Sequence, residues 1–124
     1  MRSFPRTVTG CRPSVFKVQE SLGLTDYAFR IFKDCALRAH REYCARYYRS
    51  RWADDNVAWS SLPPGEIVDL VQMMFSLCIS EHVMFPPTLT RPQINAGMEK
   101  RLQQVRRTWQ STVRSKKNKK MAEA

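Results

Sequence analysis

The stretch GEIVDLVQMMFSLCISEHVMFPPTLTRPQ, residues 65–93, decides the fold because it joins two predicted helices through a proline corner. Over residues 65–85 apolar side chains fall on nearly every helical face, and only Glu66, Asp69 and Glu81 are charged. The strongly apolar part is about 14 residues long, whereas a helix that crosses a bilayer needs about 20. The sequence therefore predicts a central buried helix rather than a membrane span.

A helix that is apolar all round needs cover on every side. A chain of 124 residues can hardly provide that cover alone. We therefore expect partner proteins, and Met73, Met74 and Phe75 of this helix are candidates for contact with them.

Both ends of this helix are predicted structural corners. Pro86 and Pro87 cannot continue it, and His82 lies in its last turn, where an imidazole can bond the last free carbonyls. Leu62 and Pro63 form the corresponding corner before the helix. His82 is thus predicted to be a corner residue rather than a catalyst.

Residues 91–115 give the clearest helical pattern in the chain. Thr90 and Gln93 form a capping box around Pro92, which suits a first helical turn. An apolar stripe follows at steps of three and four residues: Ile94, Met98, Leu102, Val105, Trp109 and Val113. Five basic residues lie mostly off this stripe: Lys100, Arg101, Arg106, Arg107 and Arg114. We expect the stripe to be core, but a basic amphipathic helix also fits a membrane surface or a partner's groove, with Trp109 as a contact.

Residues 26–51 form another amphipathic pattern, with Thr25 as the expected N-cap. Its apolar stripe comprises Ala28, Ile31, Phe32, Cys35, Ala39 and Tyr43. In the second half of this segment, arginines alternate with tyrosines and with Trp52. Four arginines are partner-contact candidates: Arg38, Arg41, Arg46 and Arg49. They suit the carboxylates of an assembly or anionic lipid headgroups, or else RNA phosphates with tyrosines stacked on bases.

The remaining chain predicts a short helix over 14–22, with Ser14 as cap and Gly23 as stop. The turn after residue 51 holds Asp54, Asp55 and Asn56, a run that suits a helix start, and then the hydrophobic anchors Trp59 and Leu62. We predict an all-α protein of three to four helices with an irregular N-terminus and a basic C-terminal tail. Its expected parts are a basic, import-like segment 1–13, a single helical domain 14–115 and a flexible tail 116–124.

The net charge of the chain indicates which classes of partner it can bind. Lys and Arg number 21 against 11 Asp and Glu, a formal net charge of +10. Such an excess favours nucleic acid, an anionic membrane or an acidic protein surface. An N-terminus with arginines and no acid is typical of mitochondrial import, although Pro5 and Pro13 interrupt an amphipathic helix there.

Residues suited to catalysis are scarce. The chain has two His and four Gly, and it lacks a nucleophile elbow and a phosphate loop. Glu81 and His82 are adjacent, so they do not share a helical face. Cys35 and Cys44 are nine steps apart and fall on opposite sides of a helix. We expect free thiols, and no catalytic residue, metal site or cofactor.

From Trp52 onwards, the order of features resembles the small 14 kDa matrix-side helical subunit of the mitochondrial cytochrome bc1 complex. The matching elements are the acid pair Asp54-Asp55, Leu62-Pro63, the segment from His82 to Pro86, and a charged last helix over 91–115. The resemblance implies a non-catalytic subunit that packs on cytochrome b and the core proteins. It also implies a peripheral position on the matrix side of the mitochondrial inner membrane, within the respiratory electron-transport chain.

Two alternatives remain open. The segment AFRIFKDCALRAHREY, residues 28–43, is similar to the Leu-Tyr-Arg accessory subunits of mitochondrial complexes, although it lacks that triplet; membership would imply binding of an acyl carrier protein. The basic charge also fits an RNA-contacting mitochondrial ribosomal protein, which we regard as the less favoured of the partner classes.

Overall fold

The computed structural model describes residues 13–123, and the side chains of residues 17–120. This part of the chain contains α-helices and one short 3-10 helix, without a strand, so the all-α prediction is confirmed. The elements are α1 (Pro13–Ser21), α2 (Asp26–Arg46), η1 (Trp59–Ser61), α3 (Pro64–Ser80) and α4 (Arg91–Glu123). Most of the predicted N-terminal segment 1–13, with Cys11, lies outside the described residues.

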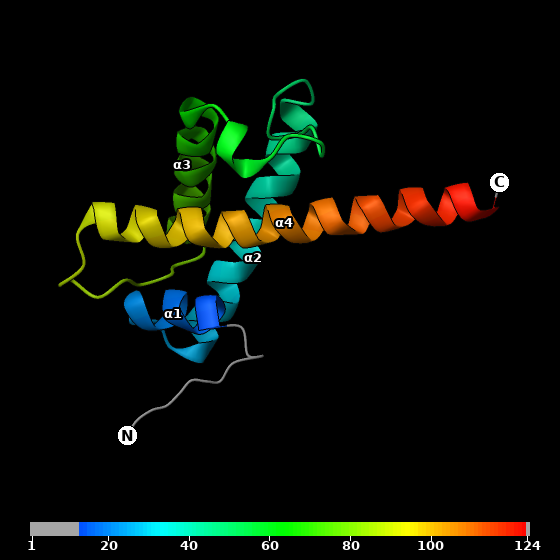
Figure 1. Cartoon of the computed structure of the whole chain (residues 1–124). Coiled ribbons are helices and arrows are strands. Elements are labelled where there is room, and N and C mark those ends of the chain that lie inside the picture. Colours follow the sequence, from blue (N-terminus) through cyan, green and yellow to red (C-terminus); the bar gives the residue numbers. More distant parts are fainter. Residues whose placement is uncertain (1–12, 124) are drawn as a thin grey trace.

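The long helix α4 organises the other three. Figure 1 shows α4 lying across α2 and α3, with α1 beneath its first half. The last turns of α4 extend beyond the other helices, so the molecule has a helical body and a projecting arm. The core is the region where the buried faces of α2, α3 and α4 meet.

The stripe predicted on α4 supplies its side of this core. Ile94, Met98, Leu102 and Val105 are buried, as expected. Trp109 and Val113, further along α4 toward its projecting end, are half-buried. On the side facing α1, a Cβ on Gly97 would lie 2.9 Å from Leu22 Cδ1. The small residue therefore permits the close approach of α1 to α4.

The predicted helix 26–51 ends earlier, at Arg46. Thr25 is its N-cap, and Thr25 Oγ1 accepts a hydrogen bond from the Ala28 amide at 3.1 Å. The end is set by tertiary contacts. The Glu66 carboxylate of α3 accepts hydrogen bonds from the Arg51 and Trp52 amides, at 3.2 and 2.7 Å. These amides are satisfied outside the helix, so the chain turns away.

Left-handed residues end both α1 and α3. Gly23 has φ 61°, and the Leu24 amide donates to the Gln19 carbonyl at 3.2 Å. His82 has φ 63°, and the Val83 amide donates to the Cys78 carbonyl at 2.9 Å. This hydrogen-bond pattern is the Schellman motif. The helix predicted over 65–85 therefore ends at Ser80, and exposed His82 forms the corner through its backbone conformation.

The other predicted boundaries shift by smaller amounts. Ser14 lies inside α1 rather than capping it, because α1 begins at Pro13. Asp54-Asp55-Asn56 forms a turn instead of a helix start, since Asp54 Oδ1 accepts a hydrogen bond from the Asn56 amide at 3.0 Å. The capping box is confirmed: Thr90 Oγ1 accepts from the Gln93 amide at 3.3 Å, and Gln93 Oε1 accepts from the Thr90 amide at 2.8 Å.

The basic segment after residue 115 is helical to Glu123, whereas the sequence predicted a flexible tail. This segment contains lysine, methionine and alanine, which favour helix, and it has no glycine or proline to stop one. Within the described residues, no helix combines the length and the apolar character that a membrane crossing requires.

Leu102 tests this account of the core because its side chain is fully buried on α4. Replacing Leu102 with Ala is expected to lower the free energy of unfolding by about 2–5 kcal/mol through lost apolar burial and the cavity left behind. Urea denaturation followed by circular dichroism measures this change. Lys100→Ala, on an exposed position of the same helix, should change the free energy by less than about 0.5 kcal/mol. Equal effects of the two substitutions would contradict the proposed core.

Candidate functional site

A buried arginine joins α4 to the loop between α2 and η1, residues 47–58, which we call the 47–58 loop. Arg106 is 1% exposed. Its guanidinium donates hydrogen bonds to four backbone carbonyls of this loop: those of Arg51, Trp52, Asp54 and Val57, at 3.2, 3.1, 2.9 and 2.8 Å. A guanidinium has five N–H donors in a rigid fork, so one side chain can hold a whole loop. Burial lowers the pKa of Arg106 below its ordinary value.

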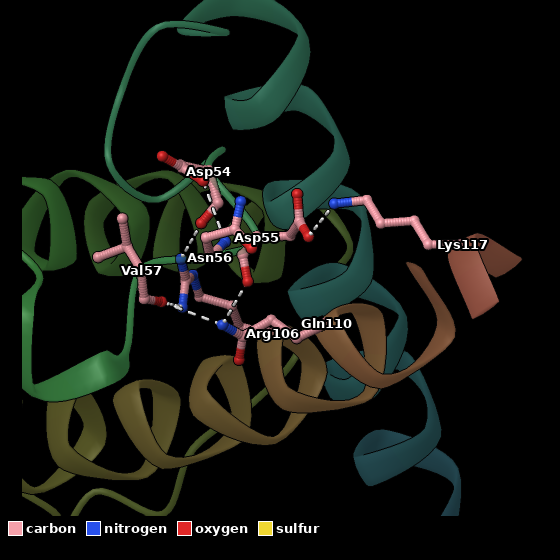
Figure 2. A network of polar contacts seen from close by, with 7 residues as sticks. All are labelled: Asp54, Asp55, Asn56, Val57, Arg106, Gln110 and Lys117. Carbon is pink, nitrogen blue, oxygen red and sulfur yellow. Dashed lines mark hydrogen bonds and ion pairs between the residues drawn. The ribbon is translucent and has the colours of Figure 1, made fainter. Parts of the chain in front are cut away.

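Two further residues of α4 extend this network, as Figure 2 shows. Gln110 Nε2 donates to the carbonyls of Asp55 and Val57, at 3.1 and 3.0 Å. Lys117 Nζ lies 3.0 Å from Asp55 Oδ2, and this hydrogen bond lowers the pKa of the Asp55 carboxyl. Three residues over three turns of α4 thus bind one loop, while Glu66 holds the loop from α3.

The loop places Trp52 in the core, where its side chain is fully buried. Trp52 Nε1 donates a hydrogen bond to His40 Nδ1 at 3.0 Å, so His40 is neutral and carries its proton on Nε2. The His40 ring also meets the Trp109 ring edge to face, with centroids 5.0 Å apart. Burial, with the charges of Arg106 and Arg41, lowers the pKa of His40 to about 4.

This cluster is structural. A general base at neutral pH needs a pKa near 7 and access to its substrate, whereas His40 is 4% exposed and its Nδ1 is occupied by Trp52. Cys44 Sγ lies 3.9 Å from His40 Nδ1, but burial raises the pKa of the Cys44 thiol, which disfavours the nucleophilic thiolate.

Two further cysteines lie in the core. Cys35 and Cys78 are buried on α2 and α3, and both are free thiols, as is Cys44. A hydrogen bond with Cys35, together with burial, raises the pKa of Cys78. No group of three or more His, Cys, Asp or Glu side chains in the described part of the chain is placed to hold a metal ion.

The four arginines predicted as partner contacts are exposed, but two already pair within the chain. Arg38 Nη1 lies 3.2 Å from Glu81 Oε2, and Arg46 Nη2 lies 2.7 Å from Glu42 Oε2. The Arg49 guanidinium lies 5.7 Å from the centre of the Tyr48 ring. Arg41 is exposed beside His40. These arginines therefore do not form one site, since they serve different local partners.

The apolar helix α3 is buried on the face that meets α2 and α4, and the described residues do not cover its other face. Leu70, Val71, Met74 and Cys78 are buried against the other helices. We call the other side the open face of α3; it consists of Val68, Gln72, Phe75, Ser76 and Ile79. Val68 and Ile79 are 56% and 53% exposed. Arg91 of α4 reaches part of this face, where its Nη2 donates to Gln72 Oε1 at 3.5 Å, and within residues 13–123 no further helix lies over it.

The three predicted contact residues of α3 are therefore in different environments. Met74 is fully buried, so it belongs to the core and is not a partner contact. Met73 and Phe75 are half-buried. The Phe75 ring is covered on one side by the Arg91 guanidinium, 3.5 Å from the ring centre. Trp109, the fourth apolar candidate, is half-buried against His40.

The predicted corners take the expected places. Leu62 is buried, and Pro63 is the N-cap of α3 with φ −62°. Pro86 lies against the end of α1, because a Cβ added to Gly23 would come 2.9 Å from Pro86 Cγ. The corner after α3 and the turn after α1 thus meet, while Pro87 is exposed.

The residues that sequence reasoning missed are Glu66, His40 and Arg106. Arg106 was assigned to the basic side of its helix, although it follows Leu102 by four residues and precedes Trp109 by three. That spacing places Arg106 on the apolar stripe and is a signal of burial. His40 similarly follows Ala36 by four residues and precedes Tyr43 by three, on the buried side of α2.

Comparisons with protein-family models, with curated proteins and with solved structures find no match to this chain. The geometry of the described residues, together with the pattern of the sequence, therefore carries the functional proposal.

Removing Arg106 tests its role in holding the 47–58 loop. Arg106→Met keeps an apolar stem but leaves the Trp52 carbonyl without its donor, which costs about 1–3 kcal/mol for a buried acceptor. It also removes one of two donors from each of the Arg51, Asp54 and Val57 carbonyls. We expect a loss of about 1–3 kcal/mol in the free energy of unfolding, measured by urea denaturation. Arg107→Met, on the exposed neighbouring position, is the matched control and should stay within about 0.5 kcal/mol. A loss below about 1 kcal/mol for Arg106→Met would show that the loop does not depend on it.

The low pKa of His40 predicts a pH dependence of stability. The unfolded chain protonates His40 near pH 6.5 and the folded chain near pH 4, so the unfolded state binds more protons between these values. The free energy of unfolding should hold its full value above pH 6.5 and fall by up to about 3 kcal/mol as the pH drops toward 4. Urea titrations between pH 7 and pH 4.5 measure this slope.

Two variants test whether His40 produces this dependence of the free energy of unfolding on pH. His40→Gln should remove most of it, whereas His82→Gln, at the exposed histidine, should leave it in place. An unchanged slope in His40→Gln would mean that other groups produce the pH dependence.

Proposed function

We propose that this chain is a non-catalytic structural subunit that occupies the surface of a larger protein assembly. The observation that carries the proposal is the open face of α3. It presents Val68 and Ile79 to solvent from an apolar helix that the described residues bury along one side. Val68, Phe75 and Ile79 occupy positions i, i+7 and i+11 of one helical face, with Gln72 at i+4. Apolar residues at such positions are the anchors by which helices pack against partner proteins.

Neighbouring residues enlarge this apolar surface. Met84 in the corner after α3 is 81% exposed. Exposed apolar side chains gathered on one helix and its following corner favour an interaction site there. Around it, the exposed Arg38–Glu81 pair provides polar groups suited to the rim of an interface.

The assembly that we propose is the mitochondrial cytochrome bc1 complex. This choice rests on the resemblance of residues 52–115 to its small matrix-side subunit and on the basic, acid-free N-terminus typical of import. In this proposal the open face of α3 contacts cytochrome b or the core proteins, and the exposed cations of α4 lie toward acidic protein surface or anionic lipid headgroups. A Leu-Tyr-Arg accessory role in another respiratory complex would use the same surfaces.

The projecting arm of α4 favours RNA binding as the second candidate function. Arg114, Lys116, Lys119 and Lys120 are exposed along this arm, and the described part of the arm up to residue 120 contains no acid. Tyr48 is 70% exposed beside Arg49, an arrangement that can stack a base and contact a phosphate. Such charge binds phosphates with a strong dependence on salt.

A native gel distinguishes these candidates. A tagged copy of the chain is extracted from mitochondria in mild detergent and resolved with and without ribonuclease. We expect comigration with a ribonuclease-resistant complex that contains b- and c-type haem. Migration with a haem-free membrane complex would replace the bc1 proposal with another respiratory complex. Release by ribonuclease would overturn both and favour RNA binding.

Substitutions on the open face test the surface itself. Val68→Glu and Ile79→Glu place a charge on exposed positions, so the isolated chain should lose less than about 1 kcal/mol of stability. Comigration with the complex should nevertheless fall at least about tenfold, since a buried unpaired carboxylate is costly at an interface. Ser111→Glu, which adds the same charge on the exposed side of α4, is the control and should comigrate normally. Normal comigration of the α3 variants would exclude the open face as the contact.

A further inference from the structure

A groove of about 650 Å³ lies between α2 and α4, away from the open face of α3. Leu37 of α2 and Val105 and Trp109 of α4 provide its apolar lining. The Trp109 ring is held by the edge-to-face contact with His40, which also lines the groove. A volume of this size with a mostly apolar lining is typical of sites that take a small molecule.

The charged residues of the groove all have the same sign. Lys33, Arg41 and Arg101 contribute to its lining, and none of the lining residues is acidic. The Lys33 ammonium lies 5.2 Å from the centre of the Phe29 ring, which places its charge near one end of α2. Low-dielectric walls focus such a field, so the groove favours an anion over a cation or a neutral molecule.

Arg101 is a partly buried cation with one unsatisfied donor. Its Nη1 donates to Gln104 Oε1 at 2.9 Å, but its Nε is buried without a hydrogen-bond partner. Burial lowers the pKa of Arg101, and no carboxylate counters this effect. A guanidinium that is partly removed from water and unpaired with an acid is destabilising until an anion approaches it. In this respect it differs from Arg38 and Arg46, which have carboxylate partners within the chain.

We propose that the α2–α4 groove is a binding site for a small organic anion, a phosphate or carboxylate attached to a compact apolar body. The anionic group lies at the Arg101 guanidinium, and Arg41 and Lys33 add positive charge elsewhere in the lining. The apolar body covers Val105, Leu37 and the Trp109 ring. This site does not depend on the assembly proposed above, because the open face of α3 and the groove involve different residues.

Calorimetric titration of the full chain tests the ligand class with four probes. These are octyl phosphate, octanol, octyltrimethylammonium and inorganic phosphate. The two surfactants, octyl phosphate and octyltrimethylammonium, are kept below their micelle concentrations. Octyl phosphate should bind at least about tenfold more tightly than the other three, because it alone combines the apolar body with the anion. Octanol binding equally well would overturn the role of charge, and inorganic phosphate binding equally well would overturn the role of the apolar lining.

Two variants locate the site. Arg101→Met should weaken octyl phosphate binding at least about tenfold, whereas Lys100→Met removes the same charge from an exposed neighbour and should change affinity less than about twofold. Thr108→Phe adds a ring at an exposed groove position without altering charge, and it should also weaken binding at least about tenfold. If Arg101→Met fails to fold, Thr108→Phe still decides the location. Unchanged affinity in Thr108→Phe, or equal losses in Arg101→Met and Lys100→Met, would overturn the assignment.

Discussion

The guanidinium of Arg106 is the constraint on which the arrangement of this protein depends. A buried arginine is tolerated only when its donors are satisfied, and the 47–58 loop satisfies four of them with backbone carbonyls. The interaction also serves the loop. The Asp54 and Val57 amides reach the Arg51 and Asp54 carbonyls, but the Trp52 carbonyl takes its hydrogen bond from Arg106. With the loop held, Trp52 enters the core and its indole N–H reaches His40. His40 in turn contacts Trp109, which lines the α2–α4 groove.

The basic residues lie in three regions of the molecule, and they have different surroundings in each. Within the body, Arg38, Arg46 and Arg106 are paired or hydrogen-bonded. In the α2–α4 groove, cations face apolar side chains without an acid nearby. Along the arm of α4, exposed lysines remain in water, apart from the pairing of Lys117 with Asp55. The net charge of +10 is thus spread over sites with different partners, and a single basic patch does not account for it.

Local signals predicted the helices well and their ends less well. The capping box at Thr90 and the helix stop at Gly23 depend on interactions within a few residues, so they can be predicted from the sequence. The end of α2 depends on Glu66, fifteen residues beyond Arg51 in the chain, so no local pattern reveals it. The same holds for the candidate contact surface: its local features were predictable from the sequence, and its tertiary features were not. The sequence shows that α3 is rich in apolar residues. That Met74 is buried in the core became known only from the packing of the helices.

The sequence by itself determined the all-α class, the stripe of α4, the corners at Pro63 and Pro86, and the strongly apolar character of α3. These follow from periodicity, capping and backbone restriction, which act over one or two helical turns. Only the tertiary structure decided that Arg106 is buried, that His40 is neutral, and that Arg101 lines a groove without a counter-charge. A side chain's charge and solvation depend on the elements that surround it, and those elements come from distant parts of the chain.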